Sequence, residues 1–300
     1  MNLKQMVQNA IPGWDGRLAG HHVGYNANGQ VHPGMPYTTN ANDPKVIQKR
    51  VQLMKDFGFD VLIDTYQGPW SSSCQTDIIL TAEECGKQGM EFALLLDPGG
   101  MKKWTSATPA QITANVEAAL SEADTTAILR SSTYVPEGYV LDFNTGADLV
   151  ALAAKFPTLK FLKQGAGFSW PTIDATITDS SLRNAASVAS LKSQHTNAAM
   201  EVASFCLSFD DSGQAQPVGV STVAAWKAAG AKQDFTSSAW GGPARRLESF
   251  GGMFAQQQLA TISATVPMIA LVTITDYNER SSGPFEVRMS ELQGVNWAAL

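Results

Sequence analysis

Short apolar runs alternate along the chain with longer segments in which apolar residues recur at the spacing of one helix face. The runs at 61–63, 93–96 and 268–272 are apolar throughout, which is typical of parallel strands covered on both faces. Strands that alternate with helices predict an α/β fold, and a single (β/α)8 TIM barrel fits their number and the chain length. A doubly wound open sheet is the alternative, although no GxGxxG follows the first strand. Eight strands are predicted, at residues 21–25, 60–64, 92–97, 139–142, 160–164, 201–209, 235–238 and 268–273.

Helix boundaries are marked by capping residues. Asp43 before a proline predicts a helix start, and Gly58 predicts its end. Thr108 and Gln111 have the spacing of a capping box and predict a second helix. Further helical patterns cover residues 221–230, where a serine begins and a glycine ends the segment, and about 72–88, 146–155, 181–194 and 248–264.

The chain shows no internal repeat, low-complexity stretch or linker that would divide its 300 residues. We therefore predict one catalytic (β/α)8 barrel domain over residues 1–300, in which 1–16 form an N-terminal lead-in. Residues 165–180 form the longest irregular stretch and are predicted to be a loop between a strand and the next helix.

The chain carries few charges, which bears on its partners. Charged residues make up 16% of the sequence, below the usual share of roughly a quarter, so neutral polar residues must cover much of the surface. This favours a neutral polar ligand. A net charge of −6 without a basic run argues against nucleic acid as a partner. The sequence leaves the oligomeric state open.

Two further features concern localisation. No stretch approaches the roughly 20 apolar residues of a membrane span, so no membrane partner is expected. The first twelve residues lack the apolar core of a signal peptide. A protein acting on extracellular polysaccharide would then be a mature form whose signal was removed, or be released by lysis.

Cysteines and histidines offer no metal-binding pattern. Cys74, Cys85 and Cys206 are too scattered for a disulfide framework or a zinc site, and we predict buried free thiols. The four histidines show no spacing typical of a metal site. We expect neither a metal ion nor an organic cofactor.

Carboxylates follow five of the predicted strands. Asp64, Asp97 and Asp142 each end an apolar run, Asp210 follows the sixth strand, and Asp276 follows the eighth. In a barrel the carboxyl ends of the strands converge on one face, where the connecting loops build the active site. Each aspartate alone is as readily a helix cap. Their agreement at five strand ends predicts an acidic site.

Aromatic residues lie near the same strand ends. Aromatic rings can pack on the apolar faces of sugars, although rings on such loops often only pack within the loop. The set comprises Tyr25, Tyr66, Trp70, Trp104, Trp170, Trp240 and Tyr277.

The sharpest candidate for acid–base chemistry is the segment TDYNER at 275–280. Asp276 and Glu279 stand three residues apart just after the last predicted strand, and such a turn can place two carboxylates on one wall of a site. Two acidic residues at this spacing are common in proteins, and it is their position after a strand that favours a catalytic role. Their geometry allows either an inverting or a retaining glycosidase.

Four blocks stand out along the chain: GFDVLI at 58–63, FALLLD at 92–97, SSAW at 237–240 and VTITDYNE at 272–279. They resemble blocks of the fungal α-1,3-glucanases (mutanases), a family of inverting glycoside hydrolases more distantly related to endo-α-mannosidases. The last block is similar to the family motif TWNDYGE, and the resemblance extends over most of the chain.

The resemblance implies that Asp276 is the general base and Glu279 the general acid of an inverting enzyme that cleaves α-glucan, first of all α-1,3-glucan. The partner would then be a polysaccharide or oligosaccharide substrate. Residues expected to bind it are Asp64, Tyr66, Gln67, Asp97, Asp142, Lys163, Asp210, Trp240 and Tyr277.

Rival interpretations come from other functional classes. A Schiff-base aldolase on the same barrel would use Lys163, which ends a predicted strand. A non-catalytic carbohydrate-binding barrel would keep the groove and lack the chemistry. A metal-dependent hydrolase would need histidine ligands that the sequence does not offer.

Overall fold

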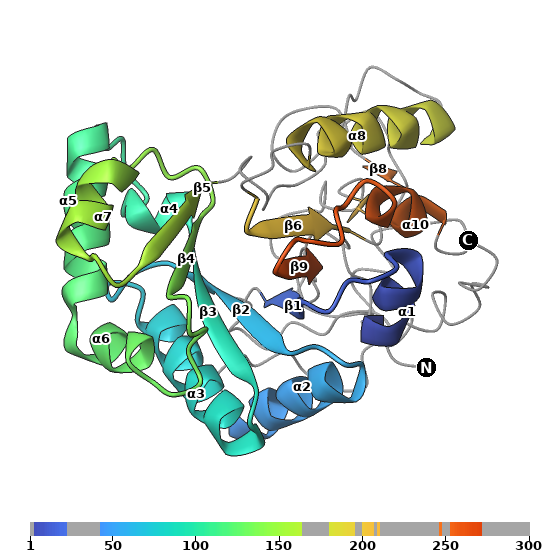
Figure 1. Cartoon of the computed structure of the whole chain (residues 1–300). Coiled ribbons are helices and arrows are strands. Elements are labelled where there is room, and N and C mark those ends of the chain that lie inside the picture. The colour runs from blue at the N-terminus through green and yellow to red at the C-terminus, as the bar shows by residue number, and fades with distance from the viewer. Residues whose placement is uncertain are drawn as a thin grey trace, which may run out of the picture.

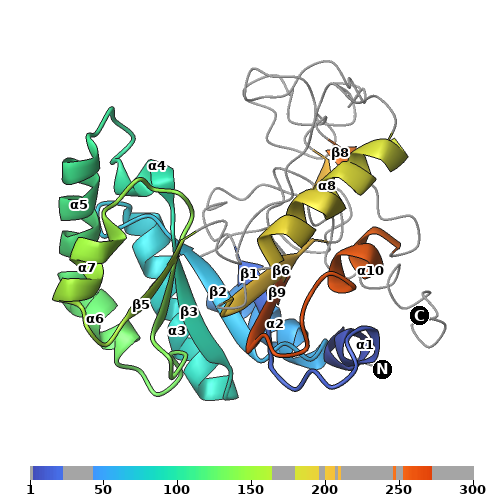
Figure 2. The ribbon, with the colours of Figure 1, turned by 45° about the horizontal axis from the view of Figure 1, so that its top comes forward.

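The computed structural model describes residues 3–22, 43–163, 180–195, 200–206, 209–210, 246–247 and 253–271. Their architecture is α/β, as predicted: seven parallel strands form one curled sheet, and helices pack against its convex side (Figures 1 and 2). Among the described residues, no helix is both long and apolar enough to cross a bilayer.

The sheet has the strand order β5-β4-β3-β2-β1-β9-β6, and every pair in it is parallel. A separate antiparallel pair consists of β7 (Phe209–Asp210) and β8 (Arg246–Leu247). The seven strands of the sheet are β1 (Arg17–His22), β2 (Val61–Tyr66), β3 (Glu91–Leu96), β4 (Tyr139–Asp142), β5 (Lys160–Lys163), β6 (Val202–Phe205) and β9 (Met268–Leu271).

Seven of the eight predicted strands overlap these elements, and the strand predicted at 235–238 lies outside the described residues. β1 begins at Arg17, four residues earlier than expected. Residues Arg17 to Gly20 contain no continuous apolar run, and they become strand because β2 and β9 pair with them on both sides.

The described sheet is curled and remains open between its edge strands β5 and β6. β6, expected as the sixth strand, pairs directly with β9, expected as the eighth, so the strand predicted at 235–238 does not lie between them as the predicted barrel order requires. The curl nevertheless brings the amino ends of β5 and β6 together. Lys160, the first residue of β5, forms an ion pair of 3.3 Å with Glu201, which directly precedes β6. One lysine side chain therefore spans the opening.

The helices lie outside the sheet. In Figure 1, α2, α3, α5, α6 and α7 lie along β2 to β5, whereas α1, α8 and α10 lie beside β1, β9 and β6. The helices are α1 (Leu3–Ala10), α2 (Pro44–Asp56), α3 (Ser72–Gln88), α4 (Pro98–Met101), α5 (Pro109–Ser121), α6 (Ala123–Leu129), α7 (Leu149–Lys155), α8 (Ser180–His195) and α10 (Met253–Leu259).

Two of the three predicted helix N-caps are confirmed, and the third, Ser221, lies outside the described residues. The Asp43 side chain accepts from the backbone N–H of Lys45, and Thr108 forms the capping box with Gln111. Helix α6 was not predicted, because its cap is the less common glutamate: Glu122 accepts from the backbone N–H groups of the first turn. The helix predicted at 248–264 is shorter, and the one at 221–230 lies outside the described residues.

The stretch expected as a lead-in contains a core helix. Leu3, Met6 and Val7 of α1 are buried and belong to the main hydrophobic core. The thiols of Cys85 and Cys206 are buried and free, as predicted.

Successive strand residues alternate between two buried layers. We call the side that packs on helices the outer face, which carries Leu18, Leu62 and Leu94, and the concave side the inner face, which carries Ala19 and Ile63. Because both faces are buried, each strand residue is committed to one layer or the other.

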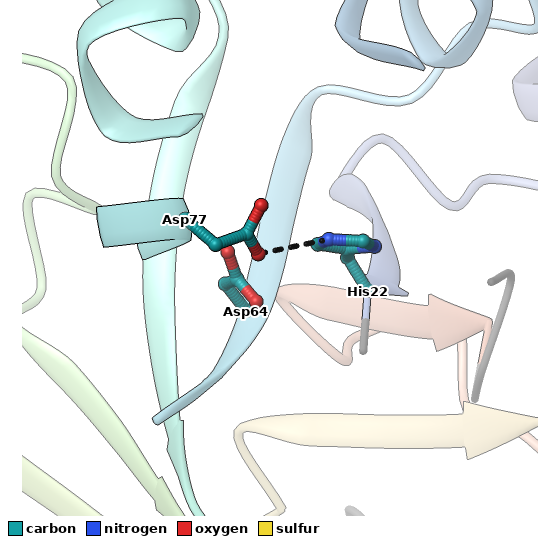
Figure 3. A group of neighbouring side chains, drawn as sticks. All are labelled: His22, Asp64 and Asp77. Carbon is teal, nitrogen blue, oxygen red and sulfur yellow. Dashed lines mark ion pairs between the residues drawn. The ribbon is translucent and has the colours of Figure 1, made fainter. Parts of the chain in front are cut away.

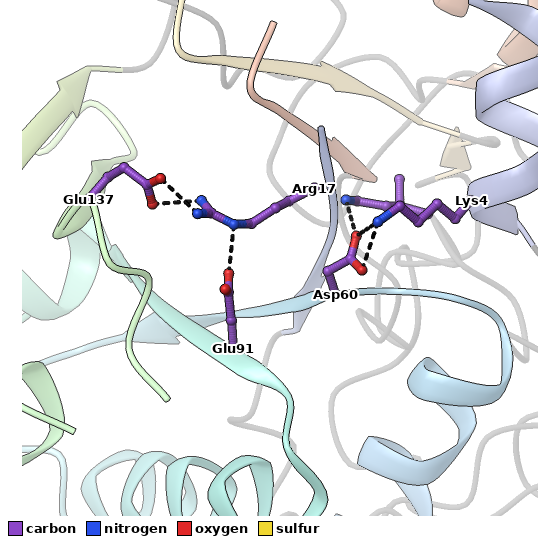
Figure 4. A network of polar contacts seen from close by, with 6 residues as sticks. Lys4, Arg17, Asp60, Glu91 and Glu137 are labelled. Atoms are coloured by element: carbon purple, nitrogen blue, oxygen red, sulfur yellow. Dashed lines mark hydrogen bonds and ion pairs between the residues drawn. The ribbon is translucent and has the colours of Figure 1, made fainter. Parts of the chain in front are cut away.

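Ion pairs tie together the amino ends of the strands (Figure 4). The guanidinium of Arg17 on β1 pairs with Glu137 at 2.6 Å and with Glu91 on β3 at 3.0 Å. The hydrogen bond from Arg17 holds the pKa of Glu137 below its usual range. These contacts join β1 to the first residue of β3 and to the segment before β4.

A second contact docks α1 at the same end. Lys4 pairs with Asp60 at 2.8 Å, and the Asp60 carboxylate also accepts from the backbone N–H of Leu18 at 2.8 Å. Asp60 therefore fixes α1 and β1 to the start of β2.

At the opposite end, Gly100 brings α4 against the end of β2. A Cβ atom at this position would lie 2.4 Å from Cα and 2.5 Å from the carbonyl oxygen of Gln67, which are backbone atoms. We expect Gly100→Ala to lower the free energy of unfolding by about 1–3 kcal/mol, measured by urea titration.

Gly86→Ala is the matched control. Its added methyl would meet only the Thr133 side chain, at 3.3 Å, and alanine is favoured inside a helix. The control should stay within about 1 kcal/mol of the parent protein. Equal losses in the two variants would contradict the backbone clash.

Candidate active site

The carboxyl ends of β1 to β5 bring several of the predicted site residues to one edge of the sheet. Because successive strand residues face opposite sides, these residues are divided between the outer and the inner face of the sheet. Asp64 lies within β2, which continues to Tyr66, and both side chains belong to the outer face. The Tyr66 hydroxyl is 2.8 Å from Thr125 Oγ1, so the Tyr66 side chain connects β2 to α6.

Two further aspartates shape the loops at this edge. Asp142 ends β4 and accepts hydrogen bonds from the backbone and hydroxyl of Thr145, the latter at 2.6 Å. Asp97 follows β3 and caps α4 by accepting from the backbone N–H of Gly100 at 2.6 Å. Burial raises the pKa of Asp97, which the backbone N–H groups of α4 partly oppose.

The inner face carries neutral polar groups, of which Gln67 was among the predicted site residues and His21 and Thr65 were not. His21 Nε2 lies 2.8 Å from Thr65 Oγ1, and both side chains are buried. Gln67, directly after β2, is also buried and accepts from the Ser71 hydroxyl at 3.2 Å. Burial, with His22 adding to it, lowers the pKa of His21 to about 3.

A neutral imidazole beside a hydroxyl and an amide can exchange hydrogen bonds with an uncharged polar ligand. The available signal was the pair His21-His22 in a strand: neighbouring residues face opposite sides, so one histidine had to face inward.

The remaining predicted residues are placed differently. Lys163 ends β5 at the open edge and is exposed. The backbone of Asp210 pairs with Arg246 in the small antiparallel sheet. The proposed acid and base, Asp276 and Glu279, lie outside the described residues with Trp240 and Tyr277.

A buried polar cluster lies on the outer face behind this edge (Figure 3). It joins His22 of β1, Asp64 of β2, Asp77 of α3 and Arg50 of α2. Asp77 Oδ2 lies 3.4 Å from His22 Nε2, and Arg50 Nη1 lies 2.7 Å from the same nitrogen and 3.6 Å from Asp77 Oδ1. No local sequence pattern indicates this cluster, because its members come from four elements.

Electrostatics distinguish the members of the cluster. Burial raises the pKa of Asp64 well above its usual range, and Asp77 adds to the rise while Arg50 opposes it. Burial, followed by the charge of Arg50, lowers the pKa of His22 to about 4. Burial thus favours the protonated form of Asp64, and His22 is neutral at pH 7 beside the Arg50 cation.

The ligand atoms of His22, Asp64 and Asp77 lie within 4.8 Å of one another, which is close enough to surround a metal ion. Arginine only donates hydrogen bonds, so His22 Nε2 must accept from Arg50, and its lone pair is already engaged. We infer that Arg50 is the cation of this cluster and that the cluster fastens α2 and α3 to the sheet.

No protein-family model and no curated protein matches the sequence. The fold is similar to that of solved structures of the GH99 endo-α-mannosidase from Bacteroides thetaiotaomicron. One structure, in complex with Bis-Tris propane, gives a TM-score of 0.57, and another gives 0.56. Each alignment has 12% sequence identity and covers 95% of this chain and 97% of the other. These neighbours are (β/α)8 barrels.

The cluster predicts a contrast between its two aspartates. Asp77→Asn removes the carboxylate that faces Arg50 and should cost about 3–5 kcal/mol of stability, the usual penalty for breaking a buried pair. Asp64→Asn replaces a buried carboxyl group, whose pKa is raised, with a neutral amide of similar shape and should cost no more than about 1 kcal/mol at pH 7. Urea unfolding at pH 7 checks both variants, and an equal cost would contradict the raised pKa of Asp64.

The pH dependence of stability provides a separate prediction. The raised pKa of Asp64 means that, above the ordinary pKa near 4, the folded state holds a proton that the unfolded state releases. Stability from this group therefore falls as pH rises, by at most about 1.4 kcal/mol per pH unit. Relative to the parent, the free energy of unfolding of Asp64→Asn should increase from pH 4 to 8. A difference in stability that does not change with pH would contradict the raised pKa of Asp64.

Proposed function

We propose that this protein is a glycoside hydrolase that cleaves an α-linked neutral polysaccharide at the carboxyl edge of a complete (β/α)8 barrel. The observation that carries the proposal is the position of β9. This strand lies between β1 and β6 in the sheet, and the motif with Asp276 and Glu279 follows it directly in the sequence. The fold shared with an endo-α-mannosidase supports the same reaction class.

The proposed chemistry is a direct displacement. Glu279 protonates the leaving glycosidic oxygen, and Asp276 activates a water molecule on the opposite face of the sugar, so the anomeric centre inverts. Such a pair needs roughly 6.5–9.5 Å between its carboxyl groups to admit the water.

The groups at the carboxyl edge of the sheet would bind the substrate. Gln67, Asp97 and Lys163 hold sugar hydroxyls, and His21 with Thr65 adds neutral hydrogen-bonding groups on β1 and β2. Asp64, Tyr66 and Asp142 support the edge from the outer face and the loops, while Asp210, Trp240 and Tyr277 complete the proposed set.

Two polymers are the leading substrates. The motif resemblance favours α-1,3-glucan, and the fold of the endo-α-mannosidase favours an α-mannan as the second candidate. Lys163 is exposed, whereas a Schiff-base lysine needs an environment that removes its charge, so the aldolase alternative has less support.

The catalytic pair is tested by substitution. Asp276→Asn and Glu279→Gln should each lower turnover roughly 10²- to 10⁴-fold, the contribution of a positioned acid or base, without changing the thermal unfolding midpoint. The measurement is reducing-end release from α-1,3-glucan and from α-mannan.

Asn278→Ala is the control, since it lies in the same segment and has no proton to transfer. Turnover close to that of the parent in either carboxylate variant would refute the assignment. Binding of polysaccharide by the parent without any release of reducing ends would instead support a non-catalytic sugar-binding protein.

The stereochemistry is tested separately. Proton NMR of the first products should show the β-anomer from an α-linked substrate, because a single displacement inverts the centre. Early α-anomer would mean a retaining mechanism, with its nucleophile among the strand-end carboxylates.

A further inference from the structure

The connection after β3 holds a tryptophan in an exposed and strained position. Lys103 and Trp104 have φ angles of 52° and 57°, in the left-handed region that costs a residue with a side chain roughly 1–2 kcal/mol. Strain of this kind persists only where the surroundings enforce it, and it concentrates at ligand-binding sites.

Local contacts enforce the conformation. The backbone N–H of Lys103 donates to the carbonyl of Gly100 at 2.8 Å, and that of Trp104 donates to Gly99 at 3.0 Å. The indole lies against Gly99 so closely that a Cβ atom there would be 2.4 Å from a ring carbon. A side chain at position 99 would therefore displace the ring from the place where it packs.

The ring is nevertheless largely in solvent. Trp104 is 67% exposed, and among the described residues only Val150 is a comparably exposed large hydrophobic side chain. A tryptophan normally gains stability by burying its ring, and this one gains little. Folding alone therefore does not account for it.

The surroundings suit a sugar ring. Trp70 lies under the same loop: its indole N–H donates to Gly100 at 2.8 Å, and the ammonium of Lys103 sits 4.4 Å from its ring centre. The neighbours of Trp104 in the sequence, at 103, 105 and 106, are exposed and polar. A single apolar face within a polar rim matches a pyranose ring, which has an apolar C–H face and a rim of hydroxyls.

The loop also lies at the appropriate edge. Asp97, which caps α4, follows the carboxyl end of β3, and Gly100 packs on Gln67 at the end of β2. Figure 2 shows α4 beyond the sheet on that side. Trp104 is thus built onto the rim of the site proposed above.

We propose that Trp104 is an outer sugar-binding platform, whose indole stacks on one pyranose ring of a neutral polysaccharide beyond the ring being cleaved. The platform rests on the proposed function and specifies its substrate as a polymer with several sugar units in contact. Its energy comes from ring packing, so its loss weakens binding and leaves the chemical step unchanged.

The test measures binding to insoluble α-1,3-glucan by depletion and to soluble α-mannan by affinity electrophoresis. Trp104→Asn keeps a residue that tolerates the left-handed backbone and removes the ring. It should weaken binding about three- to tenfold, while Trp104→Phe loses less because it retains an aromatic face. Val150→Ala is the control for an exposed apolar side chain and should bind as the parent does.

Kinetics distinguish this proposal from the proposed function. With polymer, Trp104→Asn should raise KM and leave kcat unchanged; with a short aryl α-glycoside it should match the parent. Unchanged binding by Trp104→Asn, or no binding of either polymer by the parent, overturns the platform. Binding that depends on Trp104 without hydrolysis by the parent supports the platform and contradicts the glycosidase.

Discussion

Every strand in the middle of this sheet is buried on both faces, and the packing of the rest depends on that burial. A polar residue within such a strand must find its partner in the layer that its parity assigns to it, because water cannot reach it. His22 is assigned to the outer layer, where Arg50 and Asp77 reach it from two helices. Asp64 lies in the same layer, with a carboxyl oxygen within 4.8 Å of the ligand atoms of His22 and Asp77. His21 and its partner Thr65 are assigned to the concave side.

The two ends of the strands serve different purposes. At the amino ends, opposite charges neutralise one another: Arg17 pairs with two glutamates, and Lys4 with Asp60. At the carboxyl ends, the described groups are mostly neutral or partly desolvated, and Asp97 keeps its carboxylate in a cap with a raised pKa. Ion pairs thus stabilise one end and leave the polar groups of the other able to meet a ligand.

The buried cluster and the exposed Trp104 each contain a group that costs the folded state free energy, but one is enclosed and the other is in solvent. The charge of Arg50 is enclosed and matched, so breaking the match should destabilise the fold. Trp104 is held in a strained backbone and left in solvent, so removing its ring should affect binding rather than folding. Their separate readouts, unfolding for one and polymer affinity for the other, follow from this difference in burial.

The sequence by itself determined the features that depend on neighbours along the chain. The caps at Asp43 and Thr108, the apolar strands and their alternation with helices were predicted because backbone hydrogen bonding and side-chain periodicity are local. Only the tertiary structure decided the strand order, with β9 between β1 and β6, and the direction in which each strand-end aspartate points. Asp64 was expected at a strand end, yet pairing with β3 extends β2 two residues further, and the Asp64 side chain lies within the strand, buried beside His22 and Asp77. The strand order and the direction of these side chains depend on contacts between residues distant in sequence, so no local sequence pattern predicts them.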